Sequence, residues 1–153
     1  MVTGWRIAKS KYASQAFDGE GARLYGGRWN SIGVRMVYTA QNASLAVLEI
    51  LVHLNDSNLL TAYSLCAVHL DESLVQHLDR SRLPDNWREY PAPPELQRIG
   101  DEWISNRSSL VLEVPNAIVE SESDYLINPS YPDFLSLAID APIPFSFDAR
   151  LVR

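Results

Sequence analysis

The 153-residue sequence contains very little cysteine. Cys66 is the one cysteine, so no disulfide can form within the chain. It lies in the apolar run Leu65–Val68, and we interpret it as a buried structural thiol. No group of cysteines and histidines has the spacing of a zinc site, so we expect no bound metal. A reducing cytoplasm suits this cysteine usage.

Long apolar runs and excess basic charge are also lacking. No stretch approaches the roughly 18 apolar residues of a membrane-spanning helix, and the N-terminus has no apolar segment typical of a signal peptide. We therefore expect a cytoplasmic protein with no membrane partner. The net charge of −6 disfavours a broad nucleic-acid surface, so we expect no direct contact with nucleic acid. It still allows a local basic pocket for a small anion such as a dinucleotide.

The remaining composition is typical of a globular protein, with 46% apolar and 21% charged residues. The length fits a single domain over residues 1–153. Apolar patterns predict strands over 2–8, 35–39, 61–70, 109–114, 117–119 and 125–127, with a strand-like tail over 144–152. Strands and helices do not alternate regularly, which predicts a compact α+β domain with a mixed β-sheet core and not a doubly wound nucleotide fold.

Two helices are predicted between these strands. The first begins at a cap formed by Asn42 or Ser44 and runs to about Leu54. The second runs from Glu95 to Asn106 after a proline-rich loop. Their spacing predicts apolar faces that point inward. This face consists of Leu45, Leu48 and Val52 in the first helix, and of Leu96, Ile99 and Trp103 in the second. The polar, glycine-containing segment 9–27 is predicted to be mostly loop.

The densest group of chemically suggestive residues begins at Gly26 and Gly27. Two glycines permit unusual dihedral angles or a close backbone approach next to Arg28. The planar guanidinium of an arginine can hold a phosphate through two hydrogen bonds. Arg23 and Arg35 lie nearby and could add positive charge. The same residues also fit a plain turn with a structurally paired arginine.

Tyr38 and Glu49 follow this group. A tyrosine at the end of a strand can offer its ring to a flat heterocycle or its hydroxyl to a ribose. Glu49 lies close to the inward face of its helix, where a carboxylate is costly unless it is paired or lies in a cleft. A structural Arg28–Glu49 ion pair and a core role for Tyr38 remain open alternatives. Trp29 is more typical of packing than of ligand contact.

Other polar residues give weaker signals. His53, His69 and His77 are scattered and are interpreted as surface or hydrogen-bonded histidines. The acidic segment 120–124 is interpreted as a solvated loop, and 128–134 as a rigid turn with two prolines.

Several ordered blocks together resemble the RES domain family. These blocks are Gly-Gly-Arg-Trp-Asn-Ser at 26–31 with Gly33, Val-Tyr-Thr-Ala at 37–40, the segment 44–53, the segment 114–119 and the segment 125–134. The resemblance runs from about Trp5 to the last predicted strand. Matching order and spacing over nearly the whole chain is far more specific than any single block.

The resemblance implies a toxin of a RES–Xre toxin–antitoxin module, with a fold related to the ADP-ribosyltransferase toxins. It implies that the enzyme degrades NAD by cleaving the nicotinamide–ribose bond, with water or inorganic phosphate as acceptor. NAD would be the substrate, and no further cofactor is expected. A mono-ADP-ribosyltransferase that modifies a protein is the first alternative, and a non-catalytic antitoxin-binding homologue is the second. The implied partner is an Xre-type helix-turn-helix antitoxin, and a homodimer is compatible with the family.

The resemblance also assigns residues. The family arginine, tyrosine and glutamate match Arg28, Tyr38 and Glu49, and Trp29 joins them as an expected NAD-binding residue. Arg28 would anchor the pyrophosphate or a phosphate nucleophile. Tyr38 would pack on the nicotinamide ring or the ribose and set its orientation, and Glu49 would stabilise the charged transition state. Asn116 stands where the family usually has serine, and we expect it to position groups by hydrogen bonding. Asp124 and Tyr131 replace a usual Asn and His.

Overall fold

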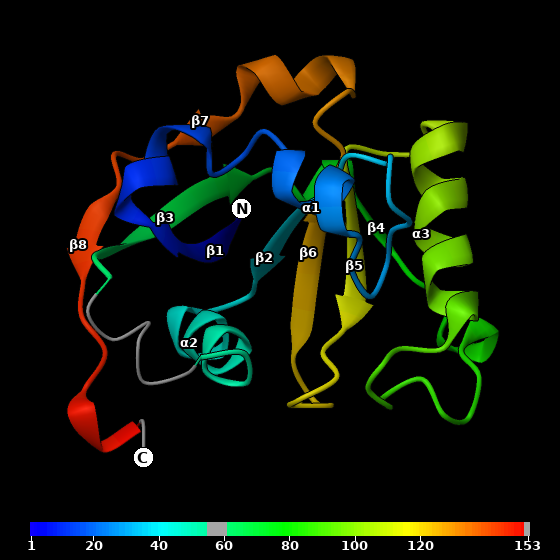
Figure 1. The fold of residues 1–153 in the computed structure, drawn as a ribbon. Helices are drawn as coiled ribbons and strands as arrows, with labels where there is room; N and C mark the ends of the chain where they lie inside the picture. The colour runs from blue at the N-terminus through cyan, green and yellow to red at the C-terminus, as the bar shows by residue number, and fades with distance from the viewer. Residues whose placement is uncertain (55–60, 152–153) are drawn as a thin grey trace.

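The computed structural model describes residues 1–54 and 61–151 (Figure 1). Within these residues, eight strands form one sheet in the order β4-β5-β6-β2-β1-β3-β7, with β8 also paired to β3. Only β4 and β5 pair in parallel, and the other neighbours are antiparallel. The predicted α+β fold with a mixed sheet is confirmed. The strands are β1 (Val2–Lys9), β2 (Val37–Ala40), β3 (Tyr63–Leu70), β4 (Val75–His77), β5 (Val111–Pro115), β6 (Ser123–Ile127), β7 (Ala138–Ile139) and β8 (Ile143–Phe145).

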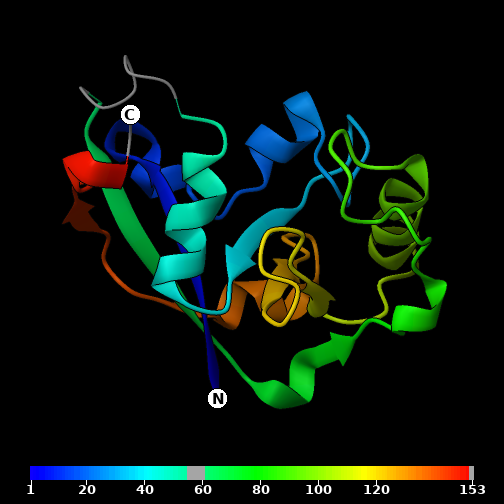
Figure 2. The ribbon, with the colours of Figure 1, turned by 90° about the horizontal axis from the view of Figure 1, so that it is seen from below.

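Three α-helices and several short 3-10 turns complete the described chain. The α-helices are α1 (Glu20–Tyr25), α2 (Ala43–Leu51) and α3 (Pro94–Asn106); the 3-10 turns are Ser10–Gln15, Glu72–Leu74, Arg80–Arg82, Pro132–Ser136 and Ala149–Leu151. No helix in residues 1–54 and 61–151 is long and apolar enough to cross a membrane. Seen from below, the turn between β5 and β6 lies between α2 and α3 (Figure 2).

The centre of the sheet is unevenly paired. β1 and β3 pair over their full lengths, from Val2 opposite Leu70 to Lys9 opposite Tyr63. β1 and β2, in contrast, are in register only at Trp5 and Ala40. Because the two strands separate beyond that pair, the sheet opens between β1 and β2. This opening positions the functional cleft.

Helix α3 packs tightly against the glycine-containing turn. Its predicted inward face is confirmed, since Leu96, Ile99 and Trp103 are buried in one apolar cluster with Trp29. A Cβ atom at Gly100 would lie 1.7 Å from the carbonyl oxygen of Trp29. Only glycine therefore allows this approach of the helix to the turn.

Helix α2 begins at the predicted cap, because Oδ1 of Asn42 accepts a hydrogen bond from the backbone N of Leu45 over 2.7 Å. The predicted inward face is only partly right. Leu45 is fully buried, but Leu48 is 37% and Val52 58% exposed. The helix instead packs through Leu45, Ala46 and Ile50, which turns its other side, including Glu49, toward the cleft.

Several other sequence predictions were wrong in detail. Residues 9–27 contain a 3-10 turn and α1 where loop was expected, and 117–119 form a bend and not a strand. The tail contains strand only at Ile143–Phe145 and then a 3-10 turn, while Val152 lies outside the described residues. The short strands β4 and β7 were not predicted. Each is stabilised by pairing with a distant strand, which local patterns do not reveal. Cys66 is buried, as predicted.

Candidate functional site

A cleft of about 1490 Å³ lies where β1 and β2 separate. Ligand pockets are commonly about 300–1,000 Å³, so this cleft is large enough for a dinucleotide. Its walls come from β1, α1, the glycine-containing turn, β2, α2 and the loop before α3. The polar and aromatic residues that line it include Arg6, Tyr25, Arg28, Tyr38, Glu49, His53, Tyr90 and Asp124.

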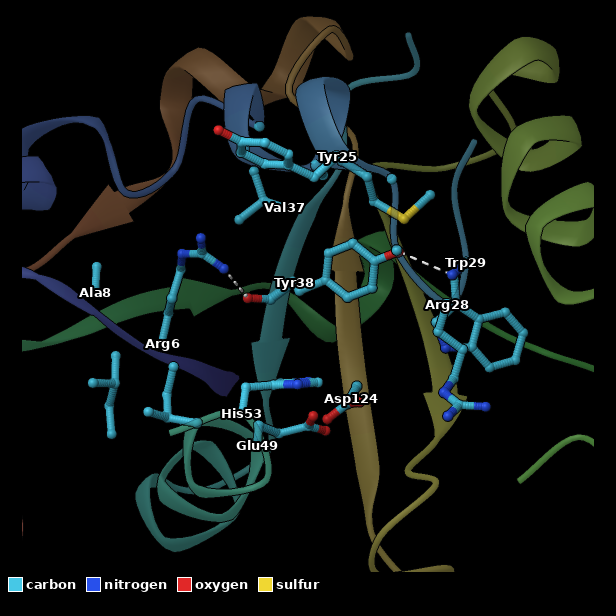
Figure 3. A pocket seen from close by; sticks show the side chains of 18 of the residues that line it. Arg6, Ala8, Tyr25, Arg28, Trp29, Val37, Tyr38, Glu49, His53 and Asp124 are labelled. Atoms are coloured by element: carbon cyan, nitrogen blue, oxygen red, sulfur yellow. Dashed lines mark hydrogen bonds between the residues drawn. The ribbon is translucent and has the colours of Figure 1, made fainter. Parts of the chain in front are cut away.

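Tyr38 stands at the centre of the cleft (Figure 3). Its hydroxyl donates to Oδ1 of Asn30 over 2.6 Å and accepts from the backbone N of Trp29 over 2.9 Å. Burial raises the pKa of the phenol, which therefore stays neutral. Because the hydroxyl is committed to these two partners, the ring face is the part of Tyr38 that is free to meet a ligand.

Glycine is needed at positions 26 and 27 for two different structural reasons. Gly26 adopts a positive φ of 71°, which side-chain-bearing residues rarely adopt. A Cβ at Gly27 would lie 2.6 Å from the Tyr38 hydroxyl and 2.9 Å from Oδ1 of Asn30. Residue 27 must therefore be glycine, because a side chain there would displace the hydrogen-bonded Tyr38 and Asn30. The amide of Gln97 in α3 holds the turn by donating to the carbonyl oxygens of Gly27 and Asn30.

Arg28 projects from this turn toward the loop before α3. Its Nη1 donates to the carbonyl oxygens of Trp87 and Glu89 over 2.8 and 3.0 Å. Partial burial lowers the pKa of Arg28, and the charge of Glu49 opposes that effect. The alternative of a direct Arg28–Glu49 ion pair is not realised, since no such contact occurs within 4.0 Å among the described residues. Arg28 therefore retains charge that its neutral partners do not cancel.

Arg6 lies on the other side of Tyr38 and was not identified from the sequence (Figure 3). Its Nη1 donates to the carbonyl oxygen of Tyr38 over 3.2 Å, across the gap between β1 and β2. Its buried Nε has no hydrogen-bond partner, and no carboxylate pairs with it in the part of the chain that the structure describes. Burial lowers the pKa of this arginine. A half-buried guanidinium that lines the cleft and has no hydrogen-bond partner at Nε is a candidate anion site.

Glu49, Asn116 and Asp124 meet at the lower end of the cleft. Nδ2 of Asn116 donates to Oε1 of Glu49, and also to the two carboxylate oxygens of Asp124 over 3.1 and 3.2 Å. Burial, and then the charge of Glu49, raise the pKa of Asp124 well above its usual range. The sequence prediction of a solvated loop at 120–124 was wrong for Asp124, which belongs to β6 and lines the cleft.

The remaining predicted residues have clear positions. The Trp29 side chain is 1% exposed and packs in the core, so it supports the cleft from behind rather than offering a ring face. Arg23 and Arg35 both pair with Glu20 and add little free charge to the cleft. His53 is exposed and lines the cleft, with its ring centroid 6.0 Å from that of Tyr90.

Sequence reasoning missed Arg6, Asp124 and Tyr90 as cleft residues. One signal for Arg6 was available, since a charged residue in a predicted strand needs a polar partner or a cleft. Asp124 carried one sign, since it replaces a usual Asn of the family, whereas Tyr90 had no local signal because tertiary packing alone brings it to the cleft. Within residues 1–54 and 61–151, no three His, Cys, Asp or Glu side chains gather as metal ligands.

Comparison with solved structures defines the fold class first. A chain of the M. tuberculosis MbcT–MbcA toxin–antitoxin complex aligns with a TM-score of 0.75 and 18% identity, over 95% of this chain and 84% of that chain. At this identity the likeness shows a shared fold. The protein thus has the fold found in a toxin–antitoxin complex.

Sequence comparison then shows the family. The RES domain model matches residues 3–148. Toxin Res of Yersinia enterocolitica is 40% identical over 148 residues, or 96% of this chain and 97% of the relative. The Prs ADP-ribosylating toxin of a Sphingobium strain is 33% identical over 154 residues, or 97% and 96% of the two chains. The chain belongs to the RES domain family of toxins, as its sequence blocks predicted.

Proposed function

We propose that the protein is a toxin that cleaves the nicotinamide–ribose bond of NAD. The observation that carries the proposal is the arrangement in one cleft of two arginines, a neutral tyrosine ring and a held carboxylate. Arg6 and Arg28 lie on opposite sides of Tyr38, and Glu49 lies below it (Figure 3). NAD offers groups that suit these residues: a diphosphate for the arginines, a flat base for the tyrosine ring, and a labile nicotinamide–ribose bond for the carboxylate.

The charged part of NAD needs cations that lack strong partners. Among the residues that the structure describes, the buried Nε of Arg6 has no partner, and Arg28 forms its hydrogen bonds with neutral carbonyl groups. Either guanidinium can bind phosphate oxygens through a planar pair of donors. We assign both to the diphosphate, with Arg28 also available to an inorganic phosphate acceptor.

The reacting end of NAD needs a carboxylate near the ribose. When the bond between C1′ and the nicotinamide nitrogen breaks, its electron pair leaves with nicotinamide and the ribose acquires oxocarbenium character. Glu49 would stabilise this positive charge, while the Tyr38 ring face packs on the base or ribose. An acceptor oxygen then bonds to C1′ and loses its proton. Asn116 fixes the direction of Glu49 through its amide.

The alternative acceptor is a protein side chain. The 33% identical relative carries the name Prs ADP-ribosylating toxin, which favours transfer to a protein as the second candidate function. Both functions use the same NAD site and the same bond cleavage. They differ only in whether water, phosphate or a protein receives ADP-ribose.

We further propose that an antitoxin restrains the protein. The fold is shared with a chain from a toxin–antitoxin complex. An Xre-type antitoxin would block the cleft, and DNA binding would belong to it and not to this acidic chain. The toxin would act in the cytoplasm, where its substrate is available, and a homodimer would be compatible with this role.

The test is NAD consumption by purified protein, with and without inorganic phosphate, followed by mass analysis of the products. We expect release of nicotinamide together with ADP-ribose or its phosphate. The Glu49→Gln variant should lose about 100-fold or more of the rate while it still folds. Incubation of labelled NAD with cell extract separates the two candidates, because label on protein supports transfer. Intact NAD in every arm would contradict both.

A further inference from the structure

The lower end of the cleft brings two carboxyl groups against one amide. Glu49 comes from α2, Asp124 from β6, and Asn116 from the turn between β5 and β6. The proposed reaction uses Glu49 alone. Asp124 is a second buried acid in the same place, without a role in that reaction.

Hydrogen bonds on both sides of Asn116 fix the direction of its amide. Its Oδ1 accepts from the backbone N of Ile118 and of Val119, each over 2.8 Å. A flipped amide would place NH2 against two donors and an oxygen against two carboxyl groups, so only the observed orientation satisfies the network. The side chain is fully buried. Asn116 therefore offers its two N–H bonds to Glu49 and Asp124.

The two carboxyl groups lie close together, because both contact the same nitrogen, Nδ2 of Asn116. Two ionised carboxylates at such a distance repel strongly, and a pair in this position usually retains one proton. The charge of Arg28 acts on both acids from the glycine-containing turn, and neutral Tyr38 faces them from β2. His53 follows the C-terminal end of α2 and, like Glu49, lines the cleft.

We propose that Asp124 is a positioning residue for Glu49. The two acids share a single proton, and this sharing keeps one carboxylate directed into the cleft. The proposal rests on the proposed function of Glu49. With one proton, the pair carries one negative charge, and the protonated acid donates a hydrogen bond to its neighbour. Asn116 supplies the second hydrogen bond to each acid. This arrangement holds the charge where the oxocarbenium character develops.

The arrangement has a consequence for pH. When the shared proton is lost in alkaline solution, the two carboxylates repel each other and Glu49 turns away from the ribose. The rate should therefore fall in alkaline solution, on a limb of the pH profile that belongs to the pair. Asn at position 124 imitates the protonated acid permanently, because its amide can donate to Glu49 at every pH.

The first experiment observes the proton directly and needs no activity. The protein is labelled with ¹³C at the aspartate carboxyl carbons and titrated by NMR, with Asp124→Asn identifying the resonance. We expect Asp124 to titrate well above the ordinary aspartate value of about 3.9. In Glu49→Gln its pKa should move down, because the neighbouring charge is gone. An ordinary pKa for Asp124, or no change in Glu49→Gln, would overturn the proposal.

The second experiment records kcat/KM for NAD against pH. In alkaline solution the kcat/KM of the parent should fall by about 100-fold, which is the alkaline limb of its profile. Asp124→Asn should keep its kcat/KM over the same pH range. His53→Gln is the matched control, because His53 is another titratable side chain that lines the cleft. It should retain the alkaline limb. If Asp124→Asn retains the limb, or if His53→Gln removes it, the positioning role is contradicted.

Failure of the proposed function gives a different result. If no variant turns over NAD at any pH, the proposed function fails, and the NMR titration alone decides whether the proton is shared. A merely structural role for Asp124 would lower stability in Asp124→Asn without removing one limb of the profile. That outcome would also contradict the proposal.

Discussion

The hydroxyl of Tyr38 donates a hydrogen bond of 2.6 Å to Oδ1 of Asn30, whose side chain is fully buried. Nδ2 of the same amide donates to the carbonyl oxygens of Ala22, Ser31 and Val34. Tyr38 therefore links the floor of the cleft to the turn that carries Arg28. The position of Arg28 therefore depends on a hydrogen bond made by Tyr38 of β2.

Replacing Tyr38 by phenylalanine tests this link. The variant leaves Oδ1 of Asn30 without its donor and the backbone N of Trp29 without its acceptor, so we expect the free energy of unfolding to fall by about 1–3 kcal/mol. The ring remains, but the turn that positions Arg28 is loosened, so the KM for NAD should also rise. Urea unfolding and steady-state kinetics measure the two effects. An unchanged unfolding midpoint would show that the hydroxyl does not hold the turn.

Gly27 and Gly21 form a matched pair of glycine tests. A Cβ at Gly27 would meet the Tyr38 hydroxyl at 2.6 Å, so Gly27→Ala should destabilise the fold by about 1–3 kcal/mol. A Cβ at Gly21, within α1, would meet no atom within 4 Å, so Gly21→Ala should stabilise by about 0.5–1 kcal/mol. Thermal unfolding of both variants gives the comparison. Equal effects of the two substitutions would refute the steric argument.

We expect Arg6 to contribute to the binding of NAD but not to the stability of the fold. Arg6→Met removes a half-buried guanidinium whose Nε has no hydrogen-bond partner, so we expect stability to be kept or to rise. The same change should raise the KM for NAD by about 10-fold or more, since it removes a charge-assisted contact. Arg98→Gln, on the exposed side of α3, is the control and should change neither value. A normal KM in Arg6→Met would remove Arg6 from the site.

Asp124 should also make the stability of the fold depend on pH. Its pKa is raised in the folded protein, so the folded state binds a proton more tightly than the unfolded state. The free energy of unfolding should therefore fall as pH rises from the unfolded value of about 3.9 through the raised folded value. Asp124→Asn should lack this decline and be more stable than the parent at neutral pH. Denaturant unfolding at several pH values measures it, and parallel curves for the two proteins would contradict the expectation.

The local patterns predicted much of the fold and part of the site. The cap at Asn42, the buried face of α3 and the major strands were correct because each depends on residues close in sequence. The orientation of α2 was partly wrong, because Leu48 and Val52 resemble core residues in type but lie on the exposed side. Packing of the helix on the sheet decided which of its apolar residues became buried.

By itself, the sequence determined the α+β class, the family blocks and three polar residues that converge on one cleft, Arg28, Tyr38 and Glu49. Turn chemistry, capping and apolar periodicity act over a few residues, and these signals can be read locally. The tertiary structure decided the separation of β1 from β2, the position of Arg6 in the cleft and the meeting of Glu49 with Asp124 at Asn116, across 75 residues of sequence. Such contacts depend on strand register and helix packing, which only the complete fold fixes.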